Sequence, residues 1–275
     1  MEQIKLIAMD MDGTLLDASQ KIPQQNLTAI QEAVAQGVHI AICSGRAASD
    51  VSFFVTDAGL MDCHVLSLNG ACCLMRPHAQ PYAVHYIETA SADFVIDTLR
   101  NFSVTFAAFQ PSRVIVVHGD DAMNKKHWGT HVARADANAY LYGMEALEAH
   151  KSEGICKFVY IDRDRAPRIE SVREVLQPIG GLNVSSSWTN NLELMAAGVD
   201  KGAALRQLAE RLGIPRVQVM AMGDYDNDLD MIAYAGLGVA MENGAERVKQ
   251  AAQYVAPPNT AFGVAAAIRR FVLNG

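Results

Sequence analysis

Apolar residues along this chain come in short runs that alternate with stretches of helical periodicity. The run at residues 4–8 predicts a buried strand, and the stripe formed by Leu27, Ile30 and Val34 predicts the helix that follows it. The same pattern predicts strands at 38–43, 65–68, 217–222 and 236–241 and helices at about 202–212 and 262–273. Strands and helices in regular alternation are typical of a parallel α/β sheet.

The middle of the chain, between about residues 83 and 188, does not follow this alternation. Its strands, such as 114–117 and 158–161, are apolar on both faces, and aromatic residues are more frequent. We therefore expect an inserted α+β domain at 83–188. The α/β domain is then assembled from residues 1–82 and 189–275.

Composition and charge argue against several classes of protein. The 275 residues, half of them apolar, can bury the core of one large or two medium domains. The net charge of −7 and the lack of any Lys/Arg-rich run argue against binding to nucleic acid. No apolar stretch approaches the roughly 18 residues of a membrane span, and no signal peptide is recognisable, so we expect a cytoplasmic protein without a membrane partner. The five cysteines are odd in number and lack CxxC spacing, and we expect reduced packing residues.

Polar side chains follow nearly every predicted strand of the α/β part, at the point where the strand ends. Open parallel sheets bind ligands at the carboxyl ends of their strands, so we expect these groups to meet in one crevice. They are Asp10 and Asp12, then Ser44 and Gly45, then Asn69, then Lys201, and finally Asp224, Asn227 and Asp228. The carboxylates suit a hard cation, and the hydroxyl, the ammonium and the backbone N–H groups suit an oxyanion. Mg²⁺ together with a phosphate group satisfies both requirements.

Phosphoryl transfer requires in-line positioning and neutralisation of the charge on the transferred group. Lys201 and a cation can supply that neutralisation. One aspartate can act as nucleophile and form an acyl phosphate. A second carboxyl group can protonate the leaving oxygen and then activate water.

In order and spacing, four segments closely resemble the motifs of the haloacid dehalogenase superfamily. They are Asp10-Met11-Asp12-Gly13-Thr14, Ser44-Gly45-Arg46, Lys201-Gly202 and Gly223-Asp224-Tyr225-Asp226-Asn227-Asp228. More narrowly, the chain is similar to the Cof-type hydrolases over essentially its whole length. That resemblance implies a Rossmann-like parallel-sheet core with an inserted α+β cap.

The resemblance also implies roles for individual residues. Asp10 is the nucleophile and a Mg²⁺ ligand, Asp12 is the general acid/base and binds the metal through its carbonyl oxygen, and Asp224 completes the metal ligands. Asp228 supports them from behind. The phosphate is held by the Met11 backbone N–H, Ser44, Gly45, Lys201 and Asn227. Ser44 stands where threonine is common, but the hydroxyl is kept.

Plainer interpretations exist for some of these residues. Taken alone, Asp10 and Asp12 could be solvated acids of a turn, and Ser44 a helix cap. Asn69 is either a turn residue or a substrate contact. His127 and His131 have the i, i+4 spacing of zinc ligands, but the acid of an HExxH motif is missing, and we reject a zinc site there.

The sequence therefore predicts a Mg²⁺-dependent phosphatase that hydrolyses small phosphorylated metabolites through an aspartyl-phosphate. A sugar phosphomutase and a non-catalytic sensor of a phosphorylated ligand are the alternatives. Arg113, Lys157 and Trp188 are candidate cap contacts to the substrate, although a structural role is favoured for each. The substrate and the oligomeric state stay open.

Overall fold

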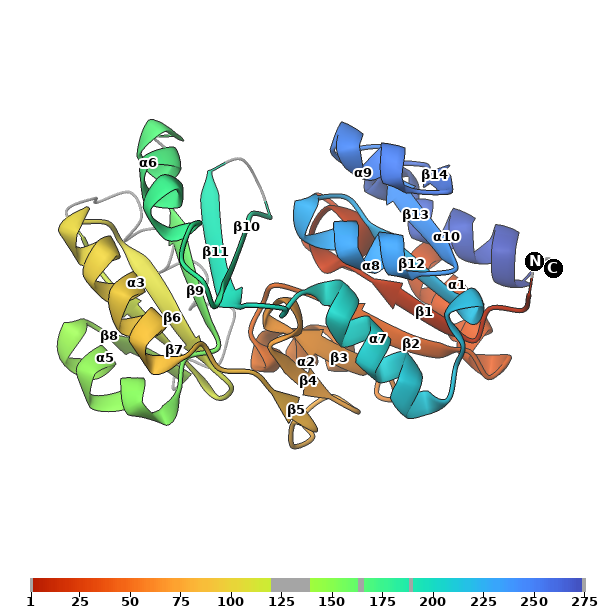
Figure 1. Ribbon diagram of the computed structural model, residues 1–275. Helices are drawn as coiled ribbons and strands as arrows, with labels where there is room; N and C mark the ends of the chain where they lie inside the picture. Colours follow the sequence, from red (N-terminus) through yellow and green to blue (C-terminus); the bar gives the residue numbers. More distant parts are fainter. Residues whose placement is uncertain (1, 120–138, 163–165, 188–189, 274–275) are drawn as a thin grey trace.

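The computed structural model describes residues 2–119, 139–162, 166–187 and 190–273, which form two sheets (Figure 1). The larger has the strand order β14-β13-β12-β1-β2-β3-β4-β5. The strands from β14 to β3 are parallel, and β4 and β5 are antiparallel to their neighbours. Their bounds are β1 Leu6–Met9, β2 His39–Cys43, β3 His64–Ser67, β4 Cys72–Leu74, β5 Ala83–Val84, β12 Val219–Gly223, β13 Leu237–Met241 and β14 Tyr254–Ala256.

Helices cover both faces of the large sheet, as the central strand β1 illustrates. Ile7 and Met9 share a buried cluster with residues of α1 and α10, whereas Leu6 and Ala8 share one with residues of α7. Side chains of a strand alternate between faces, so a strand buried on both sides reads as a continuous apolar run. The helices of this domain are α1 Gln24–Ala35, α2 Ala48–Asp57, α7 Lys201–Leu212, α8 Leu229–Tyr234, α9 Glu246–Ala251 and α10 Gly263–Ile268.

The second sheet, yellow through green to turquoise in Figure 1, has the order β10-β11-β9-β6-β7-β8 and is antiparallel except for the β7–β8 pair. Residues of α3 and α6 share a buried cluster with one face of this sheet. The strands are β6 Phe106–Gln110, β7 Arg113–Val117, β8 Tyr140–Tyr142, β9 Lys157–Ile161, β10 Leu182–Ser185 and β11 Asn191–Ala196. The helices are α3 Thr89–Asn101, α5 Met144–His150 and α6 Ala166–Leu176.

The predicted fold class, a parallel α/β sheet with an inserted α+β part, is confirmed. The division at 82/83 and 188/189 stays a proposal. Hydrogen bonding places Ala83–Val84 in the large sheet and Asn191–Ala196 in the small one. The five cysteines are buried thiols. Across the part of the chain that the structure describes, no helix has the length and apolarity to cross a bilayer.

Candidate active site

A cavity of about 460 Å³ lies between the carboxyl ends of the large-sheet strands and the small sheet. Four of the predicted site residues line it, and the small sheet supplies the opposite wall. The lining residues of the large-sheet domain are the predicted Asp10, Asp12, Gly45 and Asn227, together with Gln20, Arg46, Ala47, Asp50 and Tyr225. The lining residues of the small sheet and its loops are Phe109, Tyr140, Lys157, Val159, Ile161, Ser187, Asn191 and Glu193.

A tight turn after β1 holds the first two carboxylates. The strand ends at Met9, so this turn, rather than strand alternation, brings Asp10 and Asp12 to the same cavity. Gly13 has φ +88°, and a Cβ at this position would lie 2.3 Å from Oδ2 of Asp224. Glycine therefore allows the turn to approach the Asp224 carboxylate, whose Oδ1 accepts a hydrogen bond from the Thr14 hydroxyl at 2.9 Å.

Lys201 lies at the start of α7 and links two carboxylates that are far apart in the sequence, those of Asp10 and Asp228. Its side chain is fully buried, and Nζ donates to Oδ1 of Asp10 and to Oδ1 of Asp228, both at 2.6 Å. The Asp228 Oδ2 accepts the backbone N–H groups of Asp224 and Tyr225, at 2.8 and 3.0 Å. Both oxygens of Asp228 are thus engaged, and its carboxylate fixes the loop that carries Asp224.

The site holds more negative than positive charge. Asp10, Asp224 and Asp228 present carboxylate oxygens within 4.8 Å of one another, and Lys201 offers one balancing charge. Burial raises the pKa of Asp10 well above its ordinary value, against the influence of Lys201. Burial and the neighbouring Asp228 raise the pKa of Asp224 to about 7. Burial alone would lower the pKa of Lys201, but Asp10 and Asp228 together raise it. This acidic cluster suits a metal cation.

Of the predicted phosphate-binding residues, Gly45 and Asn227 line the same cavity as Asp10 and Asp12. Ser44 is buried, and its Oγ accepts the Arg46 N–H at 3.2 Å. Asn227 Nδ2 donates to Oδ1 of Asn69 at 3.3 Å. Asn69 has the left-handed conformation of a turn residue, φ 55°, yet its amide reaches across to the small sheet. The Met11 carbonyl oxygen accepts the Leu16 N–H at 2.9 Å and closes the turn that carries Asp10.

Some residues for which the sequence predicted no role contact the site, among them Thr14, Arg46 and Glu193. Arg46 forms a two-pronged ion pair with Asp12, from Nε at 2.8 Å and from an Nη at 2.5 Å. Its place directly after Ser44-Gly45 was the available signal. For Glu193 no local signal shows the link to the core, because its core partner Asn69 is 124 positions away in sequence.

The candidate cap contacts differ in their surroundings. Lys157 lines the cavity, whereas Arg113 pairs with Glu153 at 3.1 Å and is absent from the cavity lining. Trp188, His127 and His131 lie outside the described residues.

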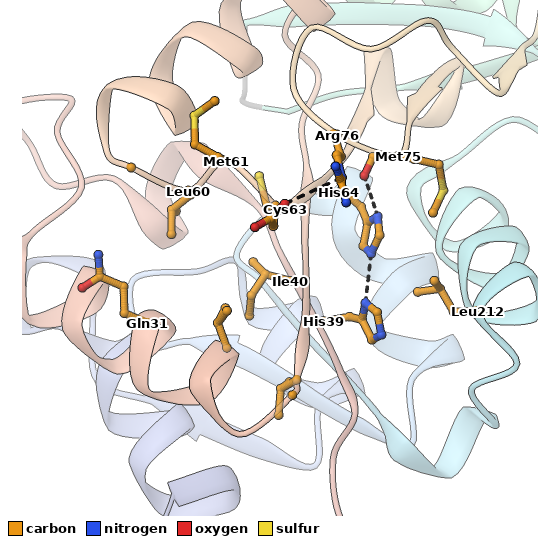
Figure 2. A pocket seen from close by; sticks show the side chains of 15 residues that line it. Gln31, His39, Ile40, Leu60, Met61, Cys63, His64, Met75, Arg76 and Leu212 are labelled. Atoms are coloured by element: carbon orange, nitrogen blue, oxygen red, sulfur yellow. Dashed lines mark hydrogen bonds and ion pairs between the residues drawn. The ribbon is translucent and has the colours of Figure 1, made fainter.

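A second cavity, of about 610 Å³, lies at the other end of β2 and β3 (Figure 2). His39 and His64, the first residues of these strands, are 3.3 Å apart between Nδ1 and Nε2, and His64 Nδ1 lies 2.9 Å from the Met75 carbonyl oxygen. Asp62 is the one acidic residue of this lining within the described chain. This second cavity lies at the amino ends of the strands, whereas open parallel sheets bind their ligands at the carboxyl ends.

Residues 7–268 match the family model described as haloacid dehalogenase-like hydrolase. The chain is 35% identical over 272 residues to the 5-amino-6-(5-phospho-D-ribitylamino)uracil phosphatase YcsE of Bacillus subtilis, covering 98% of this chain and 96% of that protein. A solved haloacid dehalogenase-like hydrolase from Bacteroides thetaiotaomicron superposes with a TM-score of 0.82 at 26% identity, covering 98% and 99% of the two chains. Another from B. subtilis gives 0.86 at 24%, covering 98% and 100%.

The chain therefore belongs to the haloacid dehalogenase-like hydrolases. Within this superfamily the chain is a Cof-type phosphatase, and the small-sheet domain is its cap. The resemblance drawn from the four sequence motifs is confirmed.

Proposed function

We propose that this protein is a Mg²⁺-dependent phosphatase that hydrolyses small phosphorylated metabolites through an aspartyl-phosphate on Asp10. The observation that carries the proposal is the Lys201 ammonium, bound at 2.6 Å to one oxygen of Asp10 at the floor of the cavity. It orients the carboxylate and leaves Oδ2 for attack on phosphorus. The nucleophile splits one difficult displacement into two easier ones.

The donor set fits a divalent cation. Two buried carboxylates, Asp10 and Asp228, and the partly buried Asp224 lie around a single ammonium, so negative charge is in excess and requires a cation or a proton as partner. Asp10 and Asp224 would hold the ion with the Asp12 carbonyl oxygen, because Asp228 is engaged on both oxygens. All these donors are oxygens, which suits Mg²⁺. Bound there, the cation would neutralise charge on the transferred phosphoryl group.

The remaining steps fall to side chains around the phosphate. Ser44, Gly45, the Met11 N–H, Lys201 and Asn227 would hold the phosphoryl oxygens. Asp12 would protonate the leaving oxygen and then take a proton from the attacking water. Arg46 would hold the Asp12 carboxylate at the cavity wall, where it is half exposed and reaches the substrate.

The cavity and the Bacillus relative point to one kind of substrate. That relative is named for a phosphorylated ribityl chain carrying a pyrimidine ring. Here the cap presents polar groups, Ser187 and Asn191, together with the aromatic Phe109 and Tyr140. A polyol or sugar monophosphate, with or without a planar ring, satisfies both kinds of surface.

The test is phosphate release from a panel of such monophosphates, with Mg²⁺ or with EDTA, by the natural protein and by Asp10→Asn. We expect release that requires both Mg²⁺ and Asp10. Equal release by a folded Asp10→Asn protein would refute the mechanism. Turnover that depends on a sugar bisphosphate would indicate a phosphomutase, and tight binding without turnover a sensor.

A further inference from the structure

The cap carries a buried ion pair that faces the cavity. Lys157 on β9 and Glu193 on β11 are joined by 3.0 Å between Nζ and Oε1, with side chains only 1% and 6% exposed. These strands are neighbours in the small sheet, so the two residues form one rigid unit, which we call the bridging pair. None of the mechanistic steps above uses it.

The bridging pair contacts Gly45, which is proposed to hold the phosphate, and Asn69, which is hydrogen-bonded to the second such residue, Asn227. Lys157 Nζ donates to the Gly45 carbonyl oxygen at 2.9 Å, and Asn69 Nδ2 donates to Glu193 Oε2 at 2.5 Å. Asn69 in turn accepts the amide of Asn227. One cap element thus reaches Gly45 directly and Asn227 through a single intermediate.

The fit at Gly45 is close. A Cβ added there would lie 3.0 Å from Lys157 Nζ, 3.1 Å from Asn69 Oδ1 and 3.5 Å from Glu193 Oε1. The loop and the bridging pair therefore lie so close that even a methyl group at Gly45 would require a neighbour to move by a few tenths of an ångström. A shift of the ammonium would move the Gly45 carbonyl group, and with it the backbone of Gly45, whose N–H on the preceding peptide is proposed to bind phosphate.

Stability alone does not account for this arrangement. Desolvating two charges is costly, and well-packed apolar residues in place of a buried ion pair are often as stable or more so. Glu193 is fully hydrogen-bonded, accepting also from Ser187 at 3.1 Å and Asn191 at 3.2 Å. Such a network fixes geometry, because each partner has a single direction in which all bonds are satisfied.

We propose that Lys157 and Glu193 are positioning residues for the hydrolysis: from the cap they hold Gly45 and, through Asn69, Asn227 in the geometry that binds the transferred phosphoryl group. This inference rests on the proposed phosphatase function. It predicts a loss in kcat rather than in substrate affinity, because misplacement of groups around the reacting phosphorus by about 1 Å costs roughly 100-fold in rate.

The test compares Lys157→Met with the double variant Lys157→Met/Glu193→Leu, each assayed below its unfolding transition. The single variant leaves Glu193 buried without its cation, so both Tm and kcat should fall. In the double variant no charge is left unpaired, and Tm should recover while kcat stays about 100-fold low. KM should stay within about 3-fold, since the changes affect mainly the transition state. Lys151→Met is the matched control: this cap lysine pairs with Asp93 and Glu148 at the surface, and its loss should leave kcat unchanged.

A double variant that regains both Tm and kcat would overturn the inference, because the pair would then be structural only. If the double variant does not fold, Asn69→Asp tests the same contact from the core: it places a carboxylate against Glu193, and Asp tolerates the left-handed backbone. Its kcat should fall similarly, and an unchanged kcat would refute the inference. Failure of the natural protein to release phosphate would instead refute the proposed function.

Discussion

Without metal, the ionisation of Asp224 should work against the folded state. Its pKa is raised from 3.8 to about 7 by burial and by Asp228, so the folded protein holds a proton that the unfolded chain releases. The stabilisation is therefore complete below about pH 4 and is lost as the pH rises through about 7. At 1.36 kcal/mol for each pKa unit, the change amounts to at most about 4 kcal/mol in the free energy of unfolding.

Urea unfolding in EDTA across this pH range measures the effect. The natural protein should lose stability relative to Asp224→Asn as the pH rises, because the amide has no proton to release. Asp62→Asn, at a carboxylate 79% exposed, should keep the natural pH dependence. Added Mg²⁺ should stabilise the natural protein more at pH 8 than at pH 5, since the ion binds the ionised carboxylates. Parallel curves for the natural protein and Asp224→Asn in EDTA would refute the reasoning.

Three further substitutions test other parts of the structure. Lys201→Met leaves Asp10 and Asp228 without their cation. It should lower the free energy of unfolding, measured in urea at neutral pH, by about 3–5 kcal/mol, and lower kcat at least about 100-fold. Stability equal to that of the natural protein would contradict the view that Lys201 balances the charge of these two carboxylates. Gly13→Ala should abolish most turnover, because the added Cβ would overlap Asp224. Gly37→Ala is the control: its φ of +82° is similar but the space around it is open, so it should lose only stability. Equal kcat in both variants would exclude the steric argument. Asn26→Leu should cost about 2–5 kcal/mol in thermal unfolding, because buried Asn26 accepts the Ala265 N–H and donates to the Leu15 carbonyl oxygen; an unchanged Tm would show that water replaces both bonds.

Local sequence patterns predicted much of the α/β domain. Strands buried on both faces read as apolar runs, and the motifs that carry Asp10, Ser44 and Asp224 lie where large-sheet strands end, so Asp10 and Asp224 could be expected at one edge of the sheet. The strands β4 and β5, of three and two residues, are too short to show the alternation of apolar and polar residues that predicts a strand.

The contacts between cap and core could not be predicted in this way. Lys157 and the Gly45 carbonyl are 112 positions apart, and Asn69 and Glu193 are 124 apart. Such contacts depend on how the small sheet lies against the large one, which neither spacing nor propensity encodes. For the same reason the sequence favoured a structural role for Lys157, whose neighbours in the chain are ordinary strand residues.

The strand order affects how the protein can fold while it is being synthesised on the ribosome. β1 gains its partner β2 early, but its other edge waits for β12, and the hydrogen bond between Thr14 and Asp224 spans 210 positions. Until most of the chain has emerged, the nascent protein carries an uncovered apolar strand edge, a template for association with other chains. We therefore expect termination between the cap and β12 to yield an aggregation-prone fragment rather than a weaker enzyme.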